Sequence, residues 1–507
     1  MPLQKLLFKP GINREITSYS NEGAWVDADK IRFRQGFPEK IGGWESISSA
    51  TFLGVCRSLK AWVTLGGVDL LGVGTNLKFY LEQGGQYNDI TPIRATTSLT
   101  NPFTTVNGNT VVTVTDATAG YENGDFVTFS GASAVGGLTL NGEFEITYIA
   151  GNTYTIVSPA AATSGATGGG SVTATYQINI GASVGVPIVG WGAGAWGLGV
   201  WGTGGSSVKP IRLWSQANFG QSLIFGPRGG GIFFWDGSGS SSTRGVLVSG
   251  IAGASGVPTV QNLLITSDAS RFVFCIGANP IGTTTQNPMH VRWSAQEDFL
   301  DWTPSAVNQA GSLTLSRGSE LVAVMQARQE ILIWSNSALY SFQYVEPPIV
   351  WSSQLVGDNI SIASQNSMAY ANGTAYWMGK DKFYKYDGRT QPLPCDVRRY
   401  VFADINPQQY DQVYAGTNEG FHEVWWFYCS SASKTNDRYV VYNYLENTWY
   451  YGTMGRTAWL DTGERPSPIA ATYNNKLVVQ EVGCDDAETT SPVAIPAYVS
   501  SGQFDLD

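Results

Sequence analysis

Charged side chains are scarce in this chain of 507 residues, because Asp, Glu, Lys and Arg make up only 14% of it, against about a quarter in ordinary soluble domains. Acidic residues outnumber basic ones by 40 to 30, which gives a net charge of −10. This balance argues against a conventional DNA-binding protein, whose surface carries a basic patch. It does not exclude a negative wall past which DNA slides, since such a wall repels phosphates.

Metal-binding residues are also few. The two histidines, His290 and His422, lie beside hydrophobic strand sequence and are too few for a three-ligand zinc site. The five cysteines form no C-x-x-C motif, which favours reduced core residues over disulfides or a zinc site. We therefore expect no metal and no cofactor. The cysteines are Cys56, Cys275, Cys395, Cys429 and Cys484.

Catalytic motifs lack the context that they need. Residues 181–185 fit G-x-S-x-G, but Pro187 and a Gly-rich run follow where a nucleophile elbow requires a helix. Residues 192–197 fit G-x-G-x-x-G, again without a following helix. No P-loop is found, and the forty acidic residues single out no pair for glycoside hydrolysis. The sequence therefore predicts a protein that is not an enzyme.

Long apolar runs are missing as well. No run of 18 apolar residues occurs, and residues 1–10 lack the apolar stretch of a signal peptide, so we expect synthesis and folding in a cytoplasm. Amphipathic helical patterns are scarce, and the best short candidate is residues 396–413. The chain is expected to be all-β.

One pattern is repeated seven times: a short apolar strand, a tight polar turn and an aromatic-rich strand. After the first copy, the starts lie 49, 59, 44, 49 and 45 residues apart. Such a period, with several strands in each unit, is typical of a β-propeller. No unit can bury its aromatic face alone, so we predict a closed propeller of six or seven blades. The copies begin near Leu71, Leu223, Phe272, Ile331, Ala375, Val424 and Ile469.

A segment without basic residues interrupts this array, since no Lys or Arg occurs between Arg94 and Lys209. Residues 98–178 contain five strand-like runs, with Gly151-Asn152 as a two-residue hairpin turn. They predict a small inserted β-barrel or sandwich. The domain plan is then a platform segment at 1–50, first propeller or platform strands at 51–97, the insert at 98–178, a Gly/Trp-rich loop at 179–210 and blades at 211–507.

The Gly/Trp-rich loop places Trp191, Trp196 and Trp201 five residues apart. This spacing suits neither a strand nor a helical face, and the glycine density excludes a helix. One interpretation is a mobile apolar loop that gates a channel or contacts a membrane or partner. The other is an irregular segment whose indoles fill the first blade or the domain junction.

Basic residues concentrate near the N-terminus. In the run D-K-I-R-F-R, strand alternation places Lys30, Arg32 and Arg34 on one face, and Arg14 and Lys40 lie nearby. The strip is interpreted as the solvated face of a half-buried strand, as a contact to an acidic subunit or adaptor, or as a DNA contact.

The runs P-G-I-N-R-E (10–15) and E-G-A-W-V-D-A-D-K-I-R-F-R-Q-G-F-P-E-K-I-G-G-W (22–44) resemble a segment that opens a group of bacteriophage tail proteins. Residues 58–62, 71–80 and 339–345 and the Gly/Trp run are similar to that group too. Outside 98–178, these matches are spread over most of the chain. The chain thus resembles the nozzle or tail-hub protein of short-tailed phages.

The resemblance implies a non-enzymatic virion protein with a platform and a β-propeller. Such proteins form a hexameric ring below the portal and adaptor, retain packaged DNA, conduct it during ejection and carry tail fibres or spikes. It implies assembly into the virion tail after synthesis in the host cytoplasm, with host envelope contact possible. Two alternatives stay open: a tail-tip propeller that binds a receptor glycan, and a propeller enzyme that cleaves one.

Overall fold

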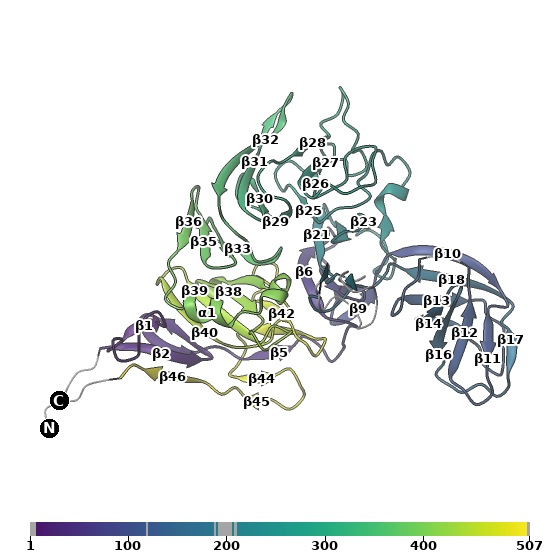
Figure 1. Ribbon diagram of the computed structural model, residues 1–507, viewed down its shortest axis with the longest axis horizontal. Helices are drawn as coiled ribbons and strands as arrows, with labels where there is room; N and C mark the ends of the chain where they lie inside the picture. Colours follow the sequence, from purple (N-terminus) through teal and green to yellow (C-terminus); the bar gives the residue numbers. More distant parts are fainter. Residues whose placement is uncertain (1–6, 118–119, 187–188, 191–204, 207–209, 504–507) are drawn as a thin grey trace.

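The computed structural model describes residues 7–117, 120–186, 189–190, 205–206 and 210–503. In this part of the chain, seven sheets follow one another around a ring as the blades of a β-propeller (Figure 1). Neighbouring blades pack through their first strands or, for blades 4 and 5, through a shared core in which the rings of Trp334 and Trp377 lie 5.4 Å apart. The predicted all-β propeller is confirmed.

Blades 1 to 6 are antiparallel four-stranded sheets with strands in chain order. In turn they contain β6 (Cys56–Val63), β7 (Asp69–Thr75), β8 (Phe79–Gln83) and β9 (Gln86–Asp89); β21 (Trp214–Phe219), β22 (Ser222–Pro227), β23 (Phe233–Trp235) and β24 (Val246–Leu247); β25 (Leu263–Thr266), β26 (Val273–Ile276), β27 (His290–Trp293) and β28 (Gly311–Thr314); β29 (Leu321–Gln326), β30 (Ile331–Ser335), β31 (Ala338–Glu346) and β32 (Val350–Asp358); β33 (Met368–Ala371), β34 (Thr374–Met378), β35 (Phe383–Tyr386) and β36 (Thr390–Leu393); β37 (Tyr414–Asn418), β38 (Glu423–Tyr428), β39 (Arg438–Asn443) and β40 (Thr448–Thr453).

The seven sequence repeats coincide with the second strands of the seven blades. Six copies begin inside these strands, and Phe272 stands one residue before β26. The second strand of each blade is covered on both faces by the neighbouring blades. Its sequence is therefore a continuous apolar run rather than an alternation of apolar and polar residues. In β38, E-V-W-W-F-Y, all six residues are buried. The repeat therefore marks the most enclosed part of each blade.

Blade 7 is completed by a strand from the other end of the chain. It contains β41 (Ala458–Leu460), β42 (Ile469–Ala471) and β43 (Leu477–Gln480), and β43 pairs with β5 (Trp44–Ser46) in an antiparallel ladder. β44 (Asp485–Ala487) and β45 (Val493–Ala494) extend the sheet beyond β5. Gly43 allows the chain before β5 to lie close to β44, because a Cβ at this position would be 2.3 Å from the Asp485 carbonyl oxygen. Pairing of distant segments thus closes the ring.

The remaining N-terminal strands lie beside blade 6. β1 (Lys9–Ile12), β2 (Ala24–Asp29) and the C-terminal β46 (Tyr498–Ser501) form one sheet, and β3 (Ile31–Arg34) forms a hairpin with β4 (Phe37–Lys40). β1, β2 and β3 all contact β40. β1, β2 and β46 lie on the side of the propeller away from the insert (Figure 1). The N-terminal segment is therefore packed against the propeller wall.

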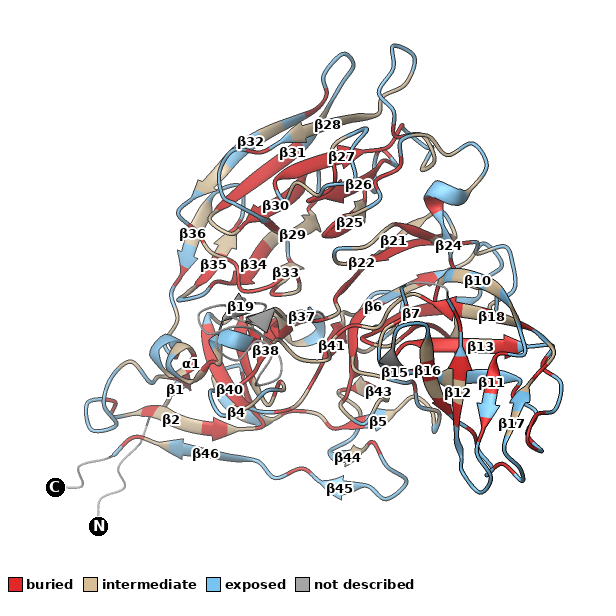
Figure 2. Ribbon diagram, turned by 45° about the vertical axis from the view of Figure 1, so that its right-hand side comes forward, coloured by how far each residue is buried: buried red, intermediate tan, exposed pale blue. Residues whose placement is uncertain are grey.

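The insert between blades 1 and 2 is a sandwich of two sheets around its own core. Figure 2 colours parts of its strands, such as β13 and β12, as buried. The Gly151-Asn152 turn is confirmed, since it joins β15 to β16. One of the five strand-like runs, E-F-E-I-T-Y (143–148), is divided between two strands rather than forming a single one: the chain changes sheets at buried Ile146, so β14 pairs with β13 and β15 with β16. The strands are β10 (Ile93–Thr100), β11 (Phe103–Thr105), β12 (Val111–Thr115), β13 (Phe126–Ser130), β14 (Gly142–Glu145), β15 (Thr147–Ala150), β16 (Thr153–Val157), β17 (Ala166–Gly168) and β18 (Ser171–Gln177).

Helices are short and few. α1 (Arg398–Asp404) and the 3-10 helix η2 (Pro407–Gln412) occupy the segment 396–413 where the sequence predicts a helix. Two further 3-10 turns are η1 (Val248–Gly250) and η3 (Glu419–Phe421), and a two-residue ladder joins β19 (Val189–Gly190) to β20 (Gly205–Ser206). None of the helices in the described ranges has the length and apolarity to cross a bilayer.

Candidate functional site

The five basic residues singled out by sequence do not form one surface strip. Arg34 is exposed, and Lys40 donates to the Cys484 carbonyl oxygen over 3.0 Å. Arg14 donates to the Tyr451 hydroxyl over 2.9 Å and lies against Tyr400. Lys30 and Arg32, in contrast, are buried. Arg32 and Arg34 share a face of β3 as predicted, since both guanidinium groups lie over the Phe421 ring. The prediction is wrong for Lys30, which occupies a left-handed turn (φ 58°) between β2 and β3, and for the exposure of Arg32, which blades 6 and 7 cover.

Arg32 is the centre of a buried ion cluster. Its Nε donates to Glu423 over 2.9 Å, and its Nη1 donates to Glu481 over 2.9 Å. Its guanidinium carbon lies 3.5 Å from the centre of the Phe421 ring. Burial alone lowers the pKa of Arg32, but the two carboxylates outweigh this effect and raise it, so the side chain stays charged. Because the guanidinium of Arg32 is buried and bonded to these side chains of its own chain, it is unsuited to bind an adaptor or DNA.

The carboxylate of Glu423 accepts hydrogen bonds from several side chains. It accepts hydrogen bonds from the Trp425 indole over 2.8 Å and from the Tyr450 hydroxyl, besides those from Arg32. Glu481 accepts from Asn418 over 3.0 Å. A cluster whose members are hydrogen-bonded to one another fixes the geometry of the segments that carry them. We interpret it as a structural joint between the β3–β4 hairpin and blades 6 and 7.

The three tryptophans of the Gly/Trp-rich loop, Trp191, Trp196 and Trp201, lie outside the described residues. The described segment that leads toward them is anchored to the propeller: Arg57 donates to the Ser183 carbonyl oxygen over 2.9 Å, and Gln409 accepts from the Gly185 amide over 2.9 Å. The gate hypothesis for these indoles therefore stays a prediction.

A cavity of about 410 Å³ opens on the inner wall of the propeller. Its wall comes from the first strands of blades 1, 5, 6 and 7 and from the loop after β41. Its accessible lining is more polar than apolar, and convergent polar groups in a concave site make it a candidate binding site. It is lined by Leu59, Lys60, Ala61, Gln365, Asn366, Met368, Tyr414, Ala415, Trp459, Leu460, Asp461, Thr462, Gly463 and Glu464.

Asp461 is the perturbed acid of this cavity. Its carboxylate accepts a hydrogen bond from the Thr417 backbone amide. Burial raises the pKa of Asp461 to about 6, and the charge of Glu419 adds to the shift. A pocket carboxyl with a raised pKa is a functional-site candidate, although ion networks perturb pKa values too. The second lining carboxylate, Glu464, is exposed and comes from the same loop.

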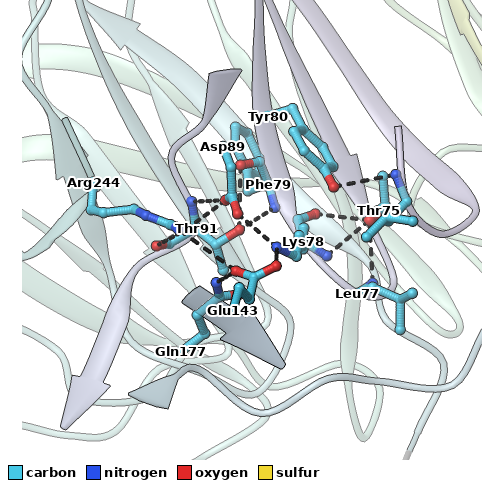
Figure 3. Close-up of polar contacts among 11 residues, drawn as sticks. Thr75, Leu77, Lys78, Phe79, Tyr80, Asp89, Thr91, Glu143, Gln177 and Arg244 are labelled. Atoms are coloured by element: carbon cyan, nitrogen blue, oxygen red, sulfur yellow. Dashed lines mark hydrogen bonds and ion pairs between the residues drawn. The ribbon is translucent and has the colours of Figure 1, made fainter. Parts of the chain in front are cut away.

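A second polar centre joins the insert to blades 1 and 2 (Figure 3). Lys78 lies just before β8, and its Nζ donates to Asp89 over 2.8 Å and also to Glu143 on β14 of the insert. Arg244, between β23 and β24, donates to Asp89 over 2.6 Å. Lys78 and Arg244 hold the pKa of Asp89 below its usual range even though burial opposes this. The insert is thus attached by charge as well as by chain connection.

Sequence reasoning missed Lys78, Glu143, Gln365 and Asp461. Glu143 could have been noticed, because it is one of five acidic residues in a segment without cations. Gln365 and Asp461 carry no local signal, since they become neighbours of one cavity only when the ring closes.

Histidines and cysteines form no reactive centre in the described part of the chain. His290 hydrogen-bonds Thr314 over 2.7 Å, and no group of three His, Cys, Asp or Glu side chains there has the arrangement of a metal site. All five cysteines are free. Cys56, Cys275 and Cys429 are buried as expected, but Cys395 is only partly buried and Cys484 is exposed, on the loop before β44.

Comparisons with known proteins yield only distant structural likenesses. No protein-family model matches the chain, and none of the curated proteins matches it. The β-propeller domain of Cps50 (Swd1) from Myceliophteria thermophila is similar over 55% of this chain and 85% of its own, at 9% identity and a TM-score of 0.33. Hsv2 from Kluyvelomyces marxianus is similar over 56% and 80%, at 8% identity and a TM-score of 0.31.

A third likeness covers more of the chain with a poorer superposition. The endosialidase of phage phi92 is similar over 93% of this chain and 79% of its own, at 11% identity and a TM-score of 0.21. TM-scores this low carry no argument about activity. The propeller assignment therefore stands on the strand pairing described above.

Proposed function

We propose that the chain is the nozzle, or tail-hub, protein of a short-tailed bacteriophage. In this role, six copies form a ring that continues the DNA channel below the portal and adaptor. The ring retains the packaged genome and conducts it during ejection. Tail fibres or spikes attach around it. The protein acts as a structural component of the virion and catalyses no reaction.

The observation that carries the proposal is the placement of the N-terminal segment. Residues 22–44, which bear the resemblance to nozzle proteins, form the strands β2, β3 and β4 against the propeller and end at Trp44 in β5 of blade 7. The arrangement supports the proposal because the resemblance implies a propeller, and the segment that bears the resemblance is packed into one. The residues that resemble nozzle proteins thus form part of the propeller wall and help to close the ring of seven blades.

The charge balance also supports a conduit. Six copies at −10 each carry about −60, and a bore of that sign repels DNA phosphates and limits adhesion. The scarcity of charged residues and the 12% aromatic content suit extensive subunit contacts. Heterologous contacts between neighbours close such a ring.

The test is the mass and shape of the native assembly. We expect the purified full-length chain, alone or with its adaptor, to form a particle of six times the chain mass of 54.6 kDa, with a central bore. Antibody labelling should place it below the portal on virions. A monomer or trimer at the tail periphery that binds host glycan would contradict the nozzle and favour the receptor-binding alternative.

A further inference from the structure

The inner-wall cavity presents hydrogen-bond acceptors without matching donors. Gln365 is 4% exposed, and its Nε2 donates to the Trp214 carbonyl oxygen over 3.1 Å. Its Oε1 has no hydrogen-bond partner among the described residues. This oxygen has almost no accessible surface, so it adds to the negative potential of the cavity wall, which favours a ligand with donor groups, without contacting that ligand itself.

The other polar groups of the cavity point to the same class of ligand. Asn366 also uses its Nδ2 on a backbone carbonyl, that of Arg57, over 3.3 Å. Asp461 and Glu464 add two carboxylates, whereas Lys60 adds one ammonium group. Within the described ranges, no ion pair joins Lys60 to either carboxylate. The cavity therefore has an excess of acceptors and of negative charge.

Apolar side chains flank these acceptors. Leu59, Met368 and Leu460 line the cavity, together with the rings of Tyr414 and Trp459. A volume of about 410 Å³ accommodates an aliphatic chain of a few carbons with a charged head group. Hydrocarbon stems pack on such walls while the charged end meets the carboxylates.

We propose that this cavity binds an organic cation, a guanidinium or ammonium group on a short aliphatic chain. The cation places its N–H donors on Asp461 and Glu464 and its stem against the apolar side chains of the wall. The group comes from a free small molecule or from an arginine or lysine side chain of a protein bound at the ring axis. Every lining residue belongs to one chain, so the inference does not depend on the proposed hexamer.

The test uses a matched pair of probes on the full-length protein. Butylguanidinium and butylurea have nearly the same shape, but only the first is charged. Isothermal titration at pH 7.5, where Asp461 is ionised, should show butylguanidinium binding at least about tenfold more tightly, the effect of a charge-assisted hydrogen bond. Equal affinities, or no binding of butylguanidinium at 10 mM, chosen as about ten thousand times a micromolar Kd, overturn the proposal.

Variants assign the binding to the cavity. Asp461→Asn keeps an acceptor for the Thr417 amide but removes the charge, and should weaken butylguanidinium binding about tenfold. Glu464→Gln, at an exposed position that tolerates substitution, should weaken it about twofold. The matched control Asp69→Asn, an exposed carboxylate on β7 of blade 1, should leave it unchanged. Unchanged affinity in Asp461→Asn, or equal loss in the control, contradicts the site.

A peptide arm distinguishes the two sources of the cation. If the tripeptide Gly-Arg-Gly with blocked ends binds as tightly as butylguanidinium, the site accepts a partner's side chain. If it does not bind while butylguanidinium does, the site is restricted to a free small cation. Both results support the proposed chemistry, and they separate a docking role from a small-molecule role.

Discussion

Two buried cations, Arg32 and Lys78, each hold two carboxylates from separate parts of the chain, but their surroundings differ. Arg32 is 1% exposed, and its partner Glu423 is fully buried. Lys78 is 4% exposed, whereas its partners Asp89 and Glu143 are 20% and 29% exposed. The first cluster lies inside the propeller wall, and the second lies at the edge where the insert joins it.

The difference shows how firmly each region is attached. A charged side chain enclosed by protein is stabilised only by its ion-pair partners, because no water molecule can replace a partner that is removed. Charges at an edge regain water when a partner is removed. The N-terminal hairpin is therefore an integral part of the propeller, whereas the insert is a separate body with its own core and a polar attachment.

Replacing Arg32 by Met should have the largest effect, because it leaves the fully buried Glu423 and the partly buried Glu481 without their cation. We expect the free energy of unfolding to fall by about 3–5 kcal/mol, measured by urea denaturation. The control is Arg34→Met two residues on, where a 57% exposed side chain should change stability by less than about 0.5 kcal/mol. Equal effects at the two positions would show that the wall cluster is not the rigid joint inferred here.

Lys78→Met should weaken the second attachment by about 1–2 kcal/mol, since Arg244 and water take over part of its role. Hydrogen exchange should rise first in residues 178–180, where Asp125 accepts from the Ile180 amide over 3.0 Å at the end of the insert. The comparison variant Lys385→Met, in blade 5, removes a half-exposed partner of Asp387 and should not alter exchange there. Faster exchange throughout the propeller instead would contradict a local attachment.

Asp461 provides the opposite case, a carboxylate whose pKa is raised to about 6 rather than lowered. The unfolded value is about 3.9, so the folded state holds the proton more tightly, and stability falls as pH rises from about 4 to 6. Above pH 6, Asp461→Asn should therefore be more stable than wild type by about 1–2 kcal/mol, allowing for partial exposure. At pH 4 the difference should nearly vanish. Thermal melts of both proteins across this range measure it.

Arg317→Ala should have the smallest effect. This residue pairs with Asp358 over 3.6 Å, and the two side chains are 63% and 39% exposed. Exposed pairs contribute less than about 1 kcal/mol and are screened by salt, so we expect a loss of at most about 0.5 kcal/mol. Urea denaturation at low and high salt is the measurement. A larger loss would mean that this edge of blade 4 is more constrained than its exposure indicates.

Much of the propeller could be predicted because its signal is local. Each repeat pairs an apolar second strand with an aromatic third strand across a tight turn, and the turn and the strand propensity lie within about fifteen residues. The insert at 98–178 was visible because its strand-like runs are local too and lie inside a stretch of 114 residues without Lys or Arg. The Gly151-Asn152 turn required only its own two residues and their flanking strands.

The sequence by itself determined the all-β class, the repeated blades and the position of the insert, because these follow from short-range strand and turn chemistry. Only the tertiary structure decided that β5 closes blade 7, that Arg32 is buried and that Asp461 and Gln365 share a cavity. Arg32 meets Glu423 and Glu481 across 391 and 449 positions of chain. Strand alternation shows which way a side chain points, but what covers it depends on segments that meet only when the ring closes.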